Sequence, residues 1–393
     1  MEWINPKTII GPPAEGDKYL ERPDISNKFW TTISNGEHIL FTAPRRVGKS
    51  SIMKDLEKNV PDGFIAIYQN VESDNSSKEF YKRIWNLIVD QLSLKASTKE
   101  KISKWLKAKK LDEISIDGKI KIENKDLDYK EELLDLIEEL GKEKHKIVLM
   151  LDEFPDVVNN ILNKEGAENA IELLHTMRAI RHEDKFKNFS MVLTGSIGLE
   201  HIVTIIDRIK LINDLKRIPV GTLVEKEVDE LIHLLLDGAT MQLKDDVRKY
   251  LKEKISHWLP YFFQLMIAKC NDLAYNYQDP IISSTLIDEA FESIIQENEH
   301  FSDWEVRLKK YLPKSDYNYC IGVLTRCAHL EFSLQAAYNF SKEINPDSGY
   351  KSLIDDVLEK DGYIVIQDNI IKFLSPFLKA WWQKRHPQYE IEN

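Results

Sequence analysis

Residues 38–50 read His-Ile-Leu-Phe-Thr-Ala-Pro-Arg-Arg-Val-Gly-Lys-Ser, an apolar run followed by a basic loop. This order predicts a strand that turns sharply into a helix, with the backbone N–H groups of the turn facing an anion. Lys49 would reach the oxygens of a nucleotide's phosphates, and Ser50 would bind Mg²⁺. Ile52 and Leu56 follow at helical spacing and supply the required helix. The stretch therefore predicts a phosphate-binding loop.

The loop departs from the usual pattern at its first residue. Ala43 stands where the pattern has glycine, and alanine lacks the easy access of glycine to positive φ at that turn. The assignment therefore depends on further motifs. We expect the nucleotide to be bound by the following run: Ala43, Pro44, Arg45, Arg46, Val47, Gly48, Lys49, Ser50 and Ser51.

A second motif lies further along the chain. Five apolar residues follow Lys146, and the two acids Asp152 and Glu153 come directly after them. A run of this length fits a strand buried on both faces of a parallel sheet, and ligands bind at the carboxyl ends of such strands. We predict that Asp152 orders the Mg²⁺ shell and that Glu153 polarises the attacking water. A strand ending in a solvated acidic turn is the alternative, but it does not account for the loop upstream.

A third strand is predicted at residues 189–194, and small polar residues end it. A polar side chain between the two motifs would sense the terminal phosphate, and Thr194 and Ser196 are both candidates. An ordinary strand followed by a Gly-Ser turn is equally compatible with this stretch. Four arginines are candidates to reach the nucleotide of a neighbouring subunit and stabilise transition-state charge, and the sequence does not choose among them: Arg178, Arg181, Arg208 and Arg217.

Composition limits the class of protein. The chain has 393 residues, a net charge of -11 and 42% hydrophobic residues, which predicts a soluble protein of two or three domains. No apolar run approaches the ~20 residues that span a bilayer, and no secretion signal is visible. Three cysteines without metal spacing predict free thiols in a reducing cytoplasm. The acidic balance argues against a protein that coats nucleic acid.

The pattern along the chain predicts three units. We place a nucleotide-binding domain at 1–222, with an inserted charged segment at 95–130 in which isoleucines alternate around an Asp-Gly pair, as in a hairpin. A helical lid follows at 223–300. Residues 301–393 read helix, helix, helix, hairpin, which is winged-helix order, and Trp381 and Trp382 are expected in its core.

The third helix of the predicted winged helix is acidic. A helix that reads DNA needs basic residues that meet phosphates. The charged residues here are Lys351, Asp355, Asp356, Glu359, Lys360 and Asp361. We interpret the unit as one for protein contact or packing.

The motifs together resemble the archaeal-type ATPases, which are P-loop proteins of the AAA+ superfamily related to origin-recognition ATPases and to signal-transduction ATPases with numerous domains. The resemblance rests on the loop at 43–50, Leu151-Asp-Glu-Phe-Pro155, residues 193–199 and Trp258-Leu-Pro-Tyr261. It spans nearly the whole chain from Arg22 onward. It implies an α/β fold: an AAA+ type parallel P-loop sheet, then an all-α lid and a winged-helix domain.

The resemblance also implies ATP and Mg²⁺ as cofactors and assigns residues to them. Arg22 would lie near the adenine, although a surface arginine is as good a reading, and Pro260 would lie against the nucleotide. Trp258 stands where a lid arginine is usual, which favours a slow switch over fast hydrolysis. The resemblance places Lys49 and Ser50 on phosphate and Mg²⁺, and Asp152 on the Mg²⁺ shell. It makes Glu153 the residue that activates water and Thr194 the residue that senses phosphate.

We therefore predict a cytoplasmic ATP-dependent switch that binds ATP and ADP, self-associates into a homo-oligomer and regulates a partner protein, without a membrane. Defence against mobile elements is a frequent setting for such proteins, but no residue here demonstrates it. The alternative is a DNA-acting ATPase of the origin or transposition loader type, against which the acidic third helix and the net charge count. A nucleotide-binding module without turnover is a third possibility.

Overall fold

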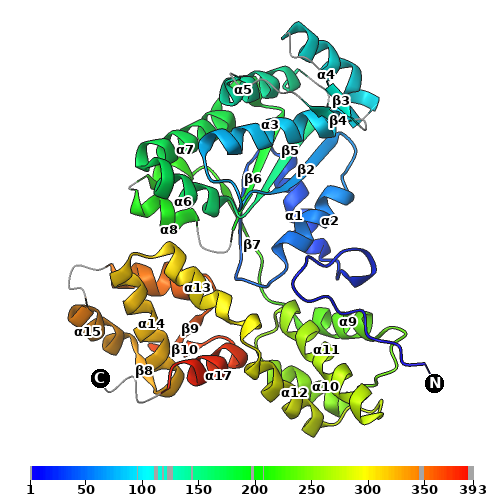
Figure 1. Cartoon of the computed structure of the whole chain (residues 1–393), viewed down its shortest axis with the longest axis vertical. Coiled ribbons are helices and arrows are strands. Elements are labelled where there is room, and N and C mark those ends of the chain that lie inside the picture. The colour runs from blue at the N-terminus through cyan, green and yellow to red at the C-terminus, as the bar shows by residue number, and fades with distance from the viewer. Residues whose placement is uncertain are drawn as a thin grey trace.

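A five-stranded parallel sheet organises the first half of the chain (Figure 1). The computed structural model describes residues 2–94, 96–109, 114–116, 119–121, 127–142, 145–195, 199–206, 208–344 and 349–387. The sheet has the order β2-β5-β6-β1-β7, so the strand before the phosphate-binding loop lies between β6 and β7. Its strands are β1 (Ile39–Thr42), β2 (Phe64–Asn70), β5 (Lys146–Asp152), β6 (Phe189–Thr194) and β7 (Lys216–Pro219).

Helices cover both faces of this sheet, because side chains along each strand alternate between the two faces. Val148 and Met150 of β5 face a core that includes α1 (Pro23–Ser34) and α2 (Lys49–Lys58), whereas Leu149 faces the opposite core. The continuous apolar run of β5 is therefore buried on both sides, as predicted. The helices of the opposite face are α3 (Ser77–Leu94), α5 (Tyr129–Leu140), α6 (Phe154–Glu165), α7 (Ala167–His182) and α8 (Leu199–Ile205).

The charged insertion stands at the outer end of α3 (Figure 1). It contains α4 (Ala96–Ala108) and an antiparallel pair, β3 (Ile114–Ile116) with β4 (Lys119–Lys121). The predicted hairpin is thus confirmed in its strands, and its Asp-Gly turn lies outside the described residues. Lys101 pairs with Glu139 of α5 at 3.4 Å, so at least one lysine of the insertion is paired within the chain.

Helices of the lid and the C-terminal part follow the sheet. Pro260 begins α11, where its missing N–H costs nothing. The lid helices are α9 (Glu225–Leu236), α10 (Asp245–Ile255), α11 (Pro260–Tyr277) and α12 (Ser284–Gln296). The C-terminal helices are α13 (Ser302–Tyr311), α14 (Lys314–His329), α15 (Leu334–Ile344), α16 (Tyr350–Ser352) and α17 (Pro376–Arg385). Short 3-10 helices lie at Gly16–Lys18, Asp184–Phe186, Ile209–Leu211 and Asn298–His300.

The C-terminal part also holds a small antiparallel sheet of order β8-β10-β9, with β8 (Phe332–Ser333), β9 (Ile364–Gln367) and β10 (Ile370–Phe373). The order of helices and hairpin follows the prediction, and the winged-helix assignment stays a prediction. The third helix of the predicted winged helix is not an ordinary α-helix throughout. After the short α16 the chain is wound as a π-helix over Leu353–Glu359. Such wide turns are rare and are frequent at functional sites.

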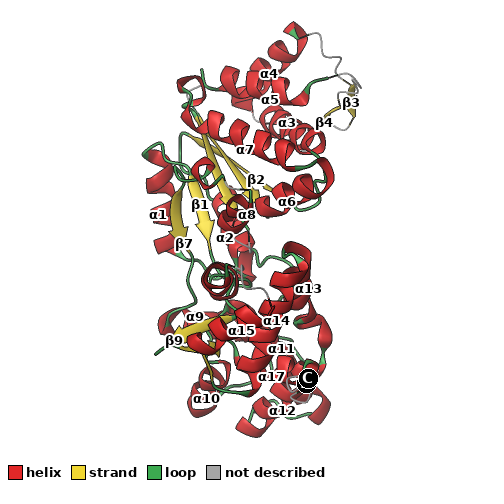
Figure 2. Cartoon of the chain, turned by 90° about the vertical axis from the view of Figure 1, so that its left-hand side faces the viewer, coloured by secondary structure: helices red, strands yellow, loops and turns green. Residues whose placement is uncertain are grey.

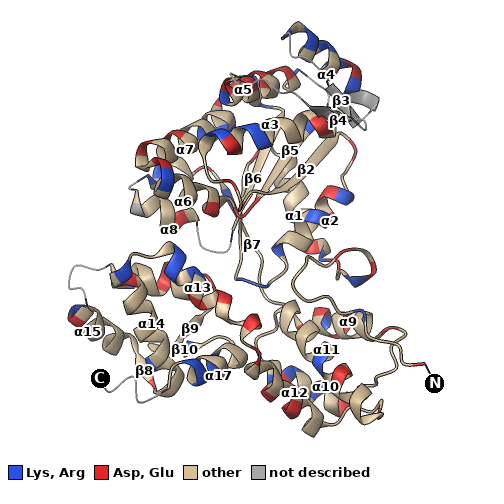
Figure 3. Cartoon of the chain, in the orientation of Figure 1, with Lys and Arg blue, Asp and Glu red and all other residues tan. Residues whose placement is uncertain are grey.

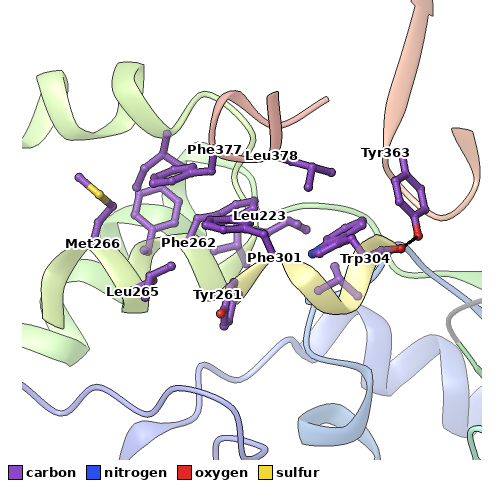
Figure 4. Packing of buried hydrophobic residues seen from close by; sticks show 14 of the residues in the cluster. Leu223, Tyr261, Phe262, Leu265, Met266, Phe301, Trp304, Tyr363, Phe377 and Leu378 are labelled. Carbon is purple, nitrogen blue, oxygen red and sulfur yellow. Dashed lines mark hydrogen bonds between the residues drawn. The ribbon is translucent and has the colours of Figure 1, made fainter. Parts of the chain in front are cut away.

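The lid and the C-terminal part share one core (Figure 4). Phe377 of α17 stacks on Phe262 of α11 with ring centroids 4.8 Å apart. Phe291 of α12 also packs on the Phe377 ring, with the centroids 4.6 Å apart. Trp381 and Trp382 are buried, as expected. The predicted boundary at residue 300 therefore separates two parts that are packed together, and Figure 2 shows both below the sheet.

None of the helices in the described part of the chain has both the length and the apolar character that crossing a membrane requires. The three cysteines, Cys270, Cys320 and Cys327, are buried and unpaired, as expected for free thiols.

Candidate nucleotide site

The loop after β1 contains two residues with positive φ, and neither of them is its first residue. Arg46 has φ 63° and Gly48 has φ 94°, whereas Ala43 is not among the residues with positive φ. The turn therefore does not need, at Ala43, the positive φ that glycine would give. Alanine fits this position because its backbone lies in the region open to any residue.

Lys49, Ser50 and Asp152 meet where β1 and β5 end. Ser50 Oγ donates to Asp152 Oδ2 at 2.5 Å, and the hydroxyl of Tyr68, which the sequence did not suggest, donates to the same oxygen at 3.0 Å. Lys49 is buried, and its Nζ donates to the Ala43 carbonyl at 3.2 Å. Burial lowers the pKa of Lys49, against the charges of Glu153 and Asp152. The hydroxyl and carboxylate are the oxygen donors that Mg²⁺ prefers, so they fit the predicted metal site.

Glu153 follows Asp152 directly, and Thr194 lies on β6, between the strands that carry the loop and the acids. Glu153 caps the N-terminus of α6 in a left-handed conformation, with φ 56°. Burial raises the pKa of its carboxyl, and the charges of Lys49 and Arg307 oppose this. Thr194 ends β6, fully buried, and its Oγ1 has no hydrogen-bond partner among the described residues. Ser196, the other sensor candidate, lies outside them.

A cavity of about 230 Å³ lies beside the loop. Its walls come from the loop, the leading segment and the lid, and they include Glu153. The predicted binding residues that line it are Arg22, Arg45, Arg46, Val47, Gly48, Lys49, Ser50, Ser51 and Pro260. Ala43, Pro44 and Thr194 instead line a second cavity of about 420 Å³, between the sheet and the turn that follows the π-helix.

The comparisons agree with this geometry. The family model of the AAA domain matches residues 32–203. Residues 32–203 are an AAA domain. They span the loop, both acidic residues and the third strand, so the predicted AAA+ P-loop fold is confirmed. No curated protein sequence matches the chain.

Among the solved structures that resemble nearly the whole chain in fold are two archaeal proteins. The Walker-type ATPase PABY2304 of Pyrococcus abyssi is 16% identical, with 95% of this chain and 99% of that chain covered and a TM-score of 0.64. The ORC2 protein of Aeropyrum pernix, solved as ADPNP–ADP complexes, is 10% identical, with 94% of each chain covered and a TM-score of 0.50. At such identities the likeness establishes the fold alone.

Two arginines, one from the loop and one from the leading segment, contact the lid. Arg46 lies 4.5 Å from the ring centroid of Tyr261 in α11. Arg22 joins the leading segment to the lid, since its Nε lies 3.0 Å from Glu227 and its Nη1 donates to the Gly221 carbonyl. Arg22 is thus held at the cavity wall by the lid, and its contact to adenine stays a prediction.

Arg307 and Asp361 of the C-terminal part lie at the edge of the site, and sequence reasoning missed both as site residues. Arg307 of α13 places Nη2 3.6 Å from Glu153 Oε2. Asp361 is 5% exposed, and burial raises the pKa of its carboxyl to about 8. A Cβ on the next residue, Gly362, would lie 3.0 Å from Pro44 Cβ, so this turn touches the loop. No local pattern marks either residue, because only the packing of the C-terminal part brings them to the site.

Three of the four arginines that were candidates to reach a neighbouring subunit form ion pairs within this chain. Arg178 and Arg181 both bind Asp214, and the side chain of Arg181 is 1% exposed. Arg217 binds Glu200 at 2.6 Å. Arg208 is exposed. The buried Arg181 cannot reach a neighbouring subunit without local unfolding.

Proposed function

We propose that this protein is an ATP-binding molecular switch that hydrolyses ATP slowly and uses its nucleotide state to control self-assembly and a partner protein. One observation carries the proposal: the ends of β1 and β5 join Ser50 to Asp152 at 2.5 Å, next to Lys49 and Glu153. The cation Lys49, the hydroxyl of Ser50 and the carboxylate of Glu153 line one cavity, and a second carboxylate, Asp152, accepts a hydrogen bond from that hydroxyl. These are the groups that phosphoryl transfer requires.

The residues divide the chemistry among them. Lys49 would bind the oxygens of the terminal phosphates, and Glu153 would orient the attacking water. Ser50 and Asp152 would hold Mg²⁺, which when bound neutralises charge on the transferred phosphate. The hydroxyl of Thr194, which lacks a partner among the described residues, would donate to the terminal phosphate.

Slow turnover is supported by the composition of the lid. The lid segment 223–300 contains a single arginine, Arg248, and it does not line the cavity. A guanidinium at the transferred phosphate accelerates related reactions by about 10³–10⁵. Without one from the lid, the nucleotide would be held for long periods.

Control over the rest of the molecule is supported by the shared core. Pro260 and Tyr261 of α11 line the cavity, and the same helix stacks on α17 through Phe262 and Phe377. Filling the cavity would therefore bias the position of the lid and the C-terminal part together.

Phosphate release from purified protein tests the catalytic part of the proposal. We expect Glu153→Gln to lower the rate by at least about 10² and to leave ATP binding intact. Glu168→Gln, on the exposed start of α7, is the matched control. Equal rates in wild type and Glu153→Gln would remove Glu153 from catalysis.

Mass measurement in solution tests the assembly part. We expect the particle mass with ATP and Mg²⁺ to differ from that with ADP or without nucleotide, and Lys49→Ala to abolish the difference. One mass under all conditions would contradict nucleotide-linked assembly.

The DNA-acting alternative is tested by a gel shift with duplex DNA and ATP at low salt. Acidic and basic residues are interspersed along the C-terminal helices (Figure 3), and Asp356 in the third helix pairs with Lys360 at 2.7 Å. We expect no shift. A shift that weakens steeply with salt would favour the alternative.

A further inference from the structure

One helix of the C-terminal part, α13, contacts both halves of the nucleotide site. Asp303 forms an ion pair with Arg45 of the phosphate-binding loop, and Arg45 also lies 5.7 Å from the ring centroid of Trp304. One turn later, Arg307 lies 3.6 Å from the carboxylate of Glu153. The helix therefore connects the loop that would bind phosphate with the residue that would orient water.

The same helix is anchored to the start of α6. Asp156 is fully buried, lies in the first turn of α6 and accepts a hydrogen bond from Lys310 Nζ at 2.5 Å. The hydroxyl of Tyr311 donates to the same oxygen. Because Glu153 is the N-cap of α6, this anchor fixes α13 with respect to the catalytic carboxylate. A small shift of α13 would be felt at Glu153.

Arg307 itself is a buried cation whose partners are these acids. It is 8% exposed, and besides Glu153 its Nη2 lies 3.9 Å from Asp156 Oδ2. Its Nε and Nη2 make no hydrogen bond to the described residues. A buried guanidinium is costly without an acid beside it, so separating Arg307 from Glu153 requires α13 to move or a new anion to enter.

We propose that Arg307 is a positioning residue that restrains Glu153 and so keeps hydrolysis slow while α13 is docked. The inference rests on the proposed function, since it names the group that regulates the same site. A guanidinium at this distance competes with water for the carboxylate oxygens and holds the side chain toward α13. Movement of the C-terminal part, as on partner binding or assembly, would free Glu153 to orient water.

The test compares steady-state ATP hydrolysis by four full-length proteins. Arg307→Met is expected to raise kcat on the order of three- to tenfold with KM unchanged, because the carboxylate regains its freedom to accept from water. Arg307→Lys keeps the charge and is expected to stay near wild type. Lys309→Met removes a cation from the exposed side of the same helix and is expected to change neither constant.

Three results would overturn the restraint: a lower kcat in Arg307→Met, an unchanged kcat, or a rise equalled by Lys309→Met. Arg307→Gln, expected to behave as Arg307→Met, serves if the methionine variant does not fold. The double variant Arg307→Met/Glu153→Gln should be as slow as Glu153→Gln alone, because the gain acts through Glu153.

A second measurement does not depend on turnover. If wild type hydrolyses ATP no faster than Glu153→Gln, the proposed hydrolysis fails, but the pair is still tested by thermal unfolding. We expect Arg307→Met/Glu153→Gln to lower Tm by less than the sum of the losses in the two single variants. The reason is that either substitution alone already breaks the ion pair between the two side chains. Additive losses would show that the pair is not formed in solution and would overturn the inference.

Discussion

Arg45 and Arg46 are adjacent in the phosphate-binding loop but bind different parts of the molecule. Arg45 pairs with Asp303 of α13, and Arg46 lies over Tyr261 of α11. The loop is thus in contact with the C-terminal part and with the lid through neighbouring side chains. A change in the loop on nucleotide binding would be transmitted to both.

The first prediction concerns Lys49. Lys49→Ala should weaken ATP binding about ten- to 100-fold, because a hydrogen bond to a charged group contributes about 1.5–3 kcal/mol. The fold should be retained. Titration calorimetry measures the affinity, and Lys58→Ala, exposed at the end of the same helix, is the control. Unchanged affinity in Lys49→Ala would overturn the assignment of the loop.

The second prediction concerns the buried carboxyl of Asp361. Burial raises its pKa in the folded chain from 3.8 to about 8, so the native state binds the proton more tightly than the unfolded state. Its contribution is favourable at low pH and is lost as pH rises from about 4 to about 8. Asp361→Asn should therefore stabilise the protein by about 1 kcal/mol or more at pH 8, with no gain at pH 4.

Chemical unfolding at the two pH values measures this difference. Asp368→Asn, exposed in the turn between β9 and β10, is the matched control and should show no such pH dependence. An equal gain at both pH values would mean that ionisation of Asp361 is not the cause.

At the scale of elements, α11 has two functions. Its first turn supplies Pro260 and Tyr261 to the wall of the nucleotide cavity, and its next turns belong to the core that joins the lid to the C-terminal part. The proline at N1 fixes where this helix begins. The position of Tyr261 under Arg46 therefore follows from the start of the helix.

Tyr261→Leu should weaken ATP binding by about 1–2 kcal/mol, because it removes the aromatic face beneath a largely desolvated guanidinium. Tyr261→Phe keeps the ring and loses only the hydroxyl contact to His300 at 3.1 Å, so it should bind ATP nearly as wild type does. Titration with ATP separates the two variants. Equal losses in both would assign the effect to the hydroxyl.

At the scale of the whole molecule, the nucleotide site is completed by segments from every part of the chain. The AAA domain supplies the loop and the acids, the lid supplies Tyr261, and the C-terminal part supplies Arg307 and Asp361. The lid and the C-terminal part should move as one body, because Phe377 joins their cores.

Phe377→Ala should cost about 3–5 kcal/mol of unfolding free energy, the usual loss for a buried phenylalanine. Amide exchange should become faster in α11 and α12 of the lid as well as in α17. Tyr277→Ala, 59% exposed at the end of α11, is the control. Faster exchange confined to α17 would show that the two parts unfold independently.

The sequence by itself determined three of the five sheet strands, the loop and the acids after β5. These depend on local order: apolar runs of strand length, a turn with glycine, and polar residues at strand ends. It also predicted that Thr194 lies between the two motifs, which the order β5-β6-β1 confirms. Such features need no knowledge of distant contacts.

Only the tertiary structure decided where positive φ falls in the loop and which residues beyond it reach the site. Arg307 and Asp361 stand in helical and turn segments like many others, and nothing in their neighbours distinguishes them. They matter because the shared core of α11, α12 and α17 holds the C-terminal part against the carboxyl edge of the sheet. Packing between segments far apart in the chain depends on the shape of whole surfaces, which no local pattern encodes.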